Sequence, residues 1–166
     1  MDRDPTWGYC AFVTNYSGYA LENVHRTIEN VMKMVQRDLR LYTLSAYADE
    51  AFHRSKLDVV EDRGNLDGTP DDRIQEEFQA LIRSLNPCDL CDDKEIFAHP
   101  ARNVACLVFD EATISTLANL FFPENRMDYY EAFSDVTIKA VDIWWQCSSA
   151  NPESSYRRRK LPHCRV

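Results

Sequence analysis

The feature that most constrains the fold is a short, unbroken apolar run, ACLVF at residues 105–109. The run has the length of one strand, and a strand with apolar residues at successive positions is buried on both of its faces. We therefore expect it to lie in the middle of a sheet. Asp110 follows the run directly and ends it.

Before this run, segments with strand patterns alternate with segments that have helix patterns. Residues 7–14, WGYCAFVT, are rich in aromatic and branched side chains, which predicts a first strand. Apolar residues then recur every three or four positions from Leu21 to Leu39, which predicts an amphipathic helix of about five turns. Residues 41–51 are ambiguous, because they either extend this helix or break it. Residues 57–61, LDVVE, indicate a short second strand.

A second long helix has the clearest start in the chain. Gly68 ends a turn in which a positive φ is favourable, and Thr69 and Pro70 then fit the N-cap and the first helical position. The buried side of this helix is expected to hold four apolar residues: Ile74, Phe78, Leu81 and Leu85.

The second half of the chain adds a short helix over residues 111–120 and a last strand over residues 136–145. One domain over residues 1–150 can bury these faces, followed by a basic tail over residues 151–166. The expected fold class is α+β, with a mixed four-stranded sheet covered by two long helices in a two-layer, ferredoxin-like arrangement.

Charge and hydropathy exclude two classes of partner. The chain carries 19 basic and 27 acidic residues, a net charge of −8 at pH 7. The tail from Asn151 onward carries +4, so the rest of the chain carries −12 and would repel a phosphate backbone. No apolar run approaches the length of about 18 to 20 residues that a bilayer span needs, and no secretory signal opens the chain. We expect a cytoplasmic protein that binds neither nucleic acid nor membrane.

Cysteine and glycine usage bears on cofactors. Cys10 and Cys106 lie inside apolar runs and are expected in the core, whereas Cys88 and Cys91 have the two-residue gap found in zinc and redox sites. No second motif at diagnostic spacing completes a zinc site, so a polar loop with two thiols is the simpler interpretation. The chain has only 4 Gly and lacks the glycine motifs that bind pyrophosphate, so no nucleotide cofactor is expected. With the zinc ligands also incomplete, we expect no metal and no cofactor.

Four segments in this order resemble a known family. WGYCAFVTNY is similar to the WGY opening, and LDVVEDRGNLDGTPDDRIQEEFQALI to the EDxxxxDG stretch, of a family of small uncharacterised proteins common in filamentous fungi. ARNVACLVFDEATISTL resembles the CLVIDE strand and helix of that family, and IKAVDIWW resembles its final VKVVDxxW strand. The resemblance implies an intracellular fungal α+β protein and carries no activity with it.

The candidate site combines the first and the last predicted strand. Because side chains alternate along a strand, Trp7 and Tyr9 share one face of the first strand, and Asp142 and Trp144 share one face of the last. If these faces line one cavity, the carboxylate of Asp142 would be surrounded by aromatic rings, which raises its pKa and suits a general acid or base. The alternative is that Asp142 is a solvated residue at a strand end.

Three further residues complete the candidate site. His25 borders the buried stripe of the first helix, where it is either a proton shuttle or a packing residue. Asp110 follows the central strand and is either catalytic or the N-cap of the next helix. Tyr16 is placed with Trp7 and Trp144 among the substrate-binding residues.

Two functions from different classes fit these residues. The first is a cofactor-independent isomerase or cyclase that acts on an apolar, ring-bearing metabolite, with fungal secondary metabolism as one setting. The second is a noncatalytic protein-interaction module that uses a sheet edge or the basic tail. A homodimer is compatible with both. A cavity lined by Tyr9, Asp142 and Trp144 would favour the enzyme, and a filled core with an exposed apolar patch would favour the interaction module.

Overall fold

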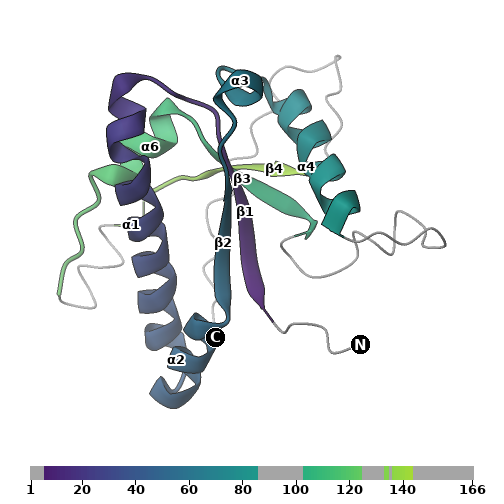
Figure 1. Cartoon of the computed structure of the whole chain (residues 1–166). Coiled ribbons are helices and arrows are strands. Elements are labelled where there is room, and N and C mark those ends of the chain that lie inside the picture. The colour runs from purple at the N-terminus through teal and green to yellow at the C-terminus, as the bar shows by residue number, and fades with distance from the viewer. Residues whose placement is uncertain (1–5, 86–102, 125–132, 135, 144–166) are drawn as a thin grey trace.

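Figure 1 shows a computed structural model of the chain, which describes residues 6–85, 103–124, 133–134 and 136–143. The elements of this part of the chain are, in order, β1 (Trp7–Val13), α1 (Gly18–Tyr42), α2 (Ser45–His53), β2 (Ser55–Val60), α3 (Arg63–Leu66), α4 (Asp71–Leu85), β3 (Ala105–Phe109), α6 (Glu111–Ala118) and β4 (Lys139–Asp142). None of the described helices combines the length and the apolar character that crossing a membrane requires.

The described strands form one mixed four-stranded sheet in the order β2-β1-β3-β4. β1 runs parallel to both β2 and β3, and β4 runs antiparallel to β3. The predicted mixed sheet is confirmed, and so is the interior position of the ACLVF run, because β3 has β1 on one side and β4 on the other.

Helices cover both faces of this sheet (Figure 1), with α1, α2 and α6 on one side and α4 on the other. Two contacts fix the faces of β1: the ring of Phe12 packs edge-on against Phe78 of α4 at 6.2 Å, and the Trp7 indole N–H donates to Ala51 of α2. The helices lie on both faces because of the connections between the parallel strands. Crossovers between parallel strands are right-handed in nearly all proteins, so a chain that moves from β1 out to β2 and then back past β1 to β3 places its helices on opposite faces.

The α+β content and the mixed sheet therefore agree with expectation, but the two-layer ferredoxin-like arrangement is not confirmed. Two long helices are present, α1 and α4, yet they do not share a layer. A β3 run that is apolar at every position needs cover on each face, and helices on both sides of the sheet provide it.

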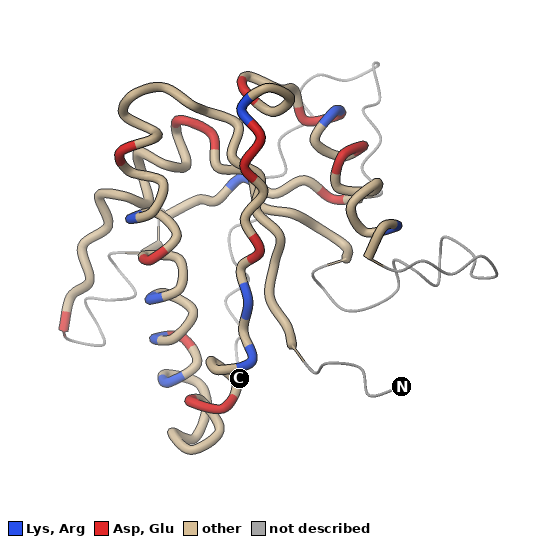
Figure 2. Tube along the Cα trace, in the orientation of Figure 1, with Lys and Arg blue, Asp and Glu red and all other residues tan. Residues whose placement is uncertain are grey.

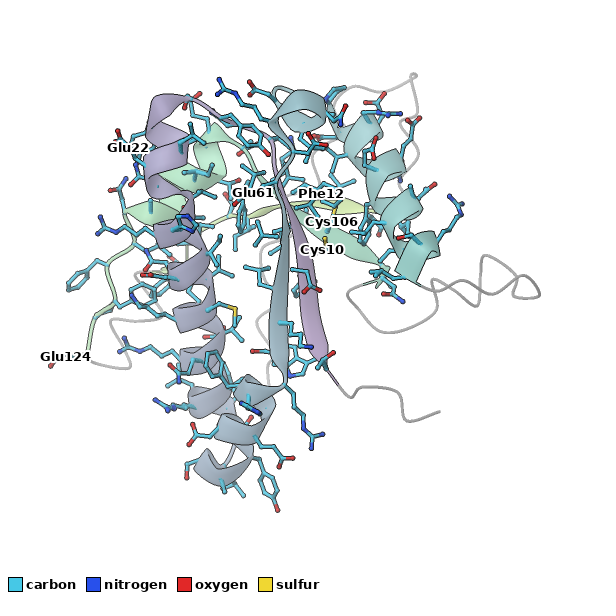
Figure 3. The ribbon with its side chains drawn as sticks, in the orientation of Figure 1. Cys10, Phe12, Glu22, Glu61, Cys106 and Glu124 are labelled. Atoms are coloured by element: carbon cyan, nitrogen blue, oxygen red, sulfur yellow. The ribbon has the colours of Figure 1, made fainter. Side chains whose placement is uncertain are left out.

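The core lies on both sides of β1 and β3. On the side of α4, Figure 3 shows Cys10, Phe12 and Cys106 gathered together, and both cysteines are buried free thiols, as predicted. α4 covers them with Ile74, Phe78 and Ile82, each almost completely buried. On the other side, α6 packs beside α1, and buried Asn30 of α1 donates to the Leu117 carbonyl oxygen at 2.8 Å.

Several local predictions need correction. Leu85 is exposed and Ile82 is buried in its place, because the buried side of α4 ends one turn earlier than predicted. Thr69 and Pro70 are predicted as the N-cap and the first residue of α4, but α4 begins at Asp71. The Thr69 hydroxyl instead donates to the Asn65 carbonyl oxygen at 2.8 Å. Residues 41–51 break the long helix, since α1 ends at Tyr42 and α2 begins at Ser45. Of the last predicted strand, only Lys139–Asp142 is β-structure among the described residues.

Gly8 is the glycine whose replacement the fold tolerates least. Its φ is +140°, and a Cβ added there would lie 1.8 Å from the Lys56 carbonyl oxygen of the neighbouring strand β2. Gly8→Ala is expected to lower the free energy of unfolding by about 3 kcal/mol, because it combines a strained backbone with a main-chain clash. Urea unfolding followed by circular dichroism measures the change.

Gly18→Ala is the matched control. Gly18 is the first residue of α1, and a Cβ there meets nothing within 4 Å. Its free energy of unfolding is expected to change by less than about 1 kcal/mol. An equal decrease in the free energy of unfolding for Gly8→Ala and Gly18→Ala would contradict the close approach of β1 to β2.

Candidate functional site

Tyr9 and Asp142 lie on the same face of the sheet but on different strands. Cys10 is opposite Cys106, and Cys106 is opposite Val141, so the residues next to them, Tyr9 and Asp142, both point away from α4. β3 lies between their two strands, which separates the strand axes by about 10 Å. Tyr9 is 40% exposed, and the Asp142 carbonyl oxygen accepts a hydrogen bond from the Gln75 side chain at 2.8 Å. Trp144 lies outside the described residues.

His25 lies elsewhere. It is exposed on α1, beside the buried Val24, in the second turn of the helix. α1 begins near the carboxyl end of β1, whereas Tyr9 is near the amino end of that strand. The structure therefore does not bring His25 together with Tyr9 and Asp142.

Asp110 caps a helix and also faces a lysine. Its carboxylate accepts a hydrogen bond from the Thr113 backbone N–H at 2.9 Å, which makes it the N-cap of α6. Its second oxygen lies 3.7 Å from the Lys139 ammonium, which also lies 2.6 Å from the Asp71 carboxylate. These three side chains are about one third exposed, and they join the start of α4 to the end of β3 and the start of β4. Sequence reasoning missed the Lys139 and Asp71 contacts, because nothing in the spacing of these residues indicates that the three elements meet.

Tyr16 is part of the interior. It is buried, and its hydroxyl oxygen accepts a hydrogen bond from the Asp62 backbone N–H at 2.8 Å. Burial raises the pKa of this hydroxyl, so Tyr16 is un-ionised at neutral pH. In open parallel sheets, ligands bind outside the carboxyl ends of the strands. Here the Tyr16 side chain joins the loop after β1 to the loop after β2 at that edge.

Trp7 lines a surface depression instead of an internal cavity. Its indole N–H donates to the Ala51 carbonyl oxygen at 2.8 Å, so the ring is held against α2. The depression is open and has a volume of about 310 Å³. Its lining residues are Trp7, Tyr47, Glu50, Ala51 and Arg54.

Three large apolar side chains are exposed beside this depression, where α1 turns into α2. Tyr42 is 61% exposed, Leu44 is 75% exposed and Tyr47 is 63% exposed. They point outward because α1 ends at Tyr42, with the Thr43 N–H bonded to the Leu39 carbonyl oxygen, and α2 begins directly after Leu44. We call Trp7, Tyr42, Leu44 and Tyr47 the aromatic corner. Sequence reasoning missed it, because residues 41–51 gave no clear pattern.

A second open depression, of about 540 Å³, lies between the beginnings of α1 and α6. It is lined by Tyr19, Glu111, Ala112 and Ser115. Neither depression includes Tyr9 or Asp142. Within the described ranges, no group of three or more His, Cys, Asp or Glu side chains could hold a metal ion, and Cys88 and Cys91 fall outside those ranges.

The core cysteine Cys106 is a poor nucleophile. Burial, followed by the neighbouring Cys10 thiol, raises the pKa of Cys106 to about 12. Since the thiolate is the reactive form, a pKa near 12 leaves only about one molecule in ten thousand reactive at pH 8. Cys106 therefore serves packing, in the same buried cluster as Cys10.

Alkylation tests that conclusion. At pH 8, iodoacetamide is expected to modify Cys106 at least a hundredfold more slowly in the folded protein than in urea, because folding both buries the thiol and keeps it protonated. Within the pH range in which the protein stays folded, raising the pH should speed the reaction, because the thiolate fraction grows. Mass mapping of the peptide that contains Cys106 measures both rates, and equal rates in the two states would contradict the burial.

The two roles of Asp110 can be separated by substitution. Asp110→Ala removes the N-cap of α6 and is expected to lower the free energy of unfolding by about 1 kcal/mol. Asp110→Asn keeps an acceptor for the Thr113 N–H and removes only the 3.7 Å contact with Lys139. Its free energy of unfolding should therefore fall much less than that of Asp110→Ala. Urea unfolding measures both variants. A loss as large for Asn as for Ala would mean that the charge, and not the cap, stabilises the helix.

Comparison with known proteins finds no relative of this chain. No family model, no curated protein and no solved structure matches the chain. The function must therefore be inferred from the exposed and buried groups of the protein itself.

Proposed function

We propose that the protein is a noncatalytic protein-interaction module that binds its partner through the aromatic corner. The observation that carries the proposal is the exposure of Tyr42, Leu44 and Tyr47, each more than three fifths exposed within six residues. A single apolar residue on a surface is ordinary, but three within six residues, one of them lining the same depression as Trp7, are typical of an interaction site.

The residue types at the corner support the same conclusion. Tyr, Trp and Arg dominate the binding energy of protein interfaces, and the depression beside the corner is lined by one of each: Tyr47, Trp7 and Arg54. The Trp7 ring is held in place by its bond to Ala51. A ring that is already fixed loses little conformational freedom when a partner binds, which favours affinity.

The interaction module is the second of the two functions that fit the sequence. The proposed isomerase or cyclase depends on a cavity shared by Tyr9, Asp142 and Trp144, and no observation on the described residues favours it. The core around β1 is filled by apolar side chains, and the two depressions are open to solvent. We place the module in the cytoplasm, a proposal supported by the free thiols of the adjacent Cys10 and Cys106.

A differential binding experiment tests the proposal. The chain is immobilised and exposed to lysate from its natural host, in parallel with Leu44→Ser/Tyr47→Ser and with Phe121→Ser. Phe121 is 75% exposed and lies after α6, away from the corner in sequence, so its replacement controls for the loss of an exposed apolar side chain.

We expect at least one protein to be retained tenfold less by the double variant and equally by the Phe121 control, because hot-spot residues near the centre of an interface carry most of the binding energy. Titration of that purified protein against each variant must reproduce the difference. Equal retention by wild type and the double variant would contradict the proposal, provided that both proteins melt at similar temperatures.

A further inference from the structure

We propose that the partner of the aromatic corner is a second copy of this chain, docked about a two-fold axis. This inference rests on the proposed interaction function and names its partner. Three observations carry it: the distribution of charge, the pairing of opposite charges around the corner, and the apolar area that the corner offers.

Charge is distributed unevenly over the described residues. From Arg37 to Lys56, which includes most of the corner, there are four basic and three acidic residues. From Leu57 to Leu85 there are three basic and eight acidic residues. Figure 2 shows this change of sign along β2, from Lys and Arg at its start to Asp and Glu at its end. Two copies of a chain with a net charge of −8 repel each other, and the repulsion is weakest where their nearly neutral corners meet.

The charges at the corner are also arranged in pairs of opposite sign. Arg40 of α1 lies 3.0 Å from Asp49 of α2, and Arg54 is paired with Glu50. All four side chains are exposed. In a two-fold interface the same surface meets itself, so it must carry both signs for each arginine to face a carboxylate of the other copy. The corner meets this requirement, whereas a surface built to bind a strongly charged partner would carry one sign.

The apolar part of the corner is large enough to form the centre of such an interface. A specific interface buries about 800 Å² on each partner, and a large aromatic side chain alone buries about 150–250 Å². The two tyrosines and Leu44 therefore supply roughly half of the required area, and the charged rim and the Trp7 depression supply the rest. Leu44 is the most exposed residue of the corner, and the open depression of about 310 Å³ has room for a side chain of that size.

The first test measures the oligomeric state. Sedimentation velocity of the full chain over a hundredfold concentration range is expected to show a reversible monomer–dimer equilibrium. Leu44→Asp should remain monomeric throughout, because it places a charge at the centre of the interface, whereas Phe121→Asp should dimerise like wild type. A monomeric wild type, or a Leu44→Asp variant that still dimerises, would overturn the inference.

The second test addresses the two-fold arrangement. Arg40→Glu/Arg54→Glu makes the corner acidic, and Asp49→Lys/Glu50→Lys makes it basic. Each variant alone should be monomeric, because like charges meet across the axis, and an equimolar mixture should form a heterodimer. These exposed pairs contribute about 0–1 kcal/mol to stability, so both variants are expected to fold, which circular dichroism checks. A mixture that stays monomeric while wild type dimerises would overturn the charge pairing.

The outcomes separate this inference from the proposed function. If wild type is monomeric at every concentration but binding of a lysate protein requires Leu44 and Tyr47, then the proposal of a second copy as partner is wrong and the proposal of an interaction module stands. If wild type neither dimerises nor retains a protein through the corner, both proposals are wrong.

Discussion

The burial of the second half of β1, Cys10 to Val13, on both faces and along both edges is the constraint on which the described structure depends. β1 lies between two parallel neighbours, and Ala11 and Phe12, which point to opposite faces, are both almost fully buried. A strand in this position needs helices above and below it. α4 reaches one face through Phe78, and α1, α2 and α6 lie over the other. The corner between α1 and α2 exists because the chain must return from that layer to pair β2 with β1.

Polar groups at the edge of the sheet where β1, β2 and β3 end hold the loops together. Gly68 donates its N–H to the Thr14 carbonyl oxygen at 2.9 Å, Tyr16 bonds to the Asp62 backbone, and Lys139 pairs with Asp71. These groups satisfy one another, as buried or half-buried polar groups in folded proteins generally do. The aromatic corner differs, because its side chains expose apolar area to water. This exposed apolar area is what the proposed partner would bury.

Sequence reasoning predicted the elements better than their buried sides. The stripe that starts at Leu21 located α1, but Leu21 is exposed, and two polar residues, Thr27 and Asn30, are buried. Their burial is stable because Thr27 donates to the Asn23 carbonyl oxygen and Asn30 to that of Leu117. The second of these partners lies 87 residues away, so a local pattern could not have indicated it. The sequence also left Asp110 open between catalysis and capping, and the hydrogen bond from the Thr113 N–H shows that it caps α6.

By itself, the sequence located β1, α1, β2, α4, β3 and α6, but not the short helices α2 and α3. It also indicated that Cys10 and Cys106 are buried and that β3 lies inside a sheet, since each of these follows from local patterns of apolar residues. Only the tertiary structure decided the layer on which each helix packs, because that depends on the order of the strands and the handedness of the connections. The same holds for the exposure of the aromatic corner. Tyr42, Leu44 and Tyr47 are of residue types common in cores, yet all three are exposed at the junction where α1 ends and α2 begins.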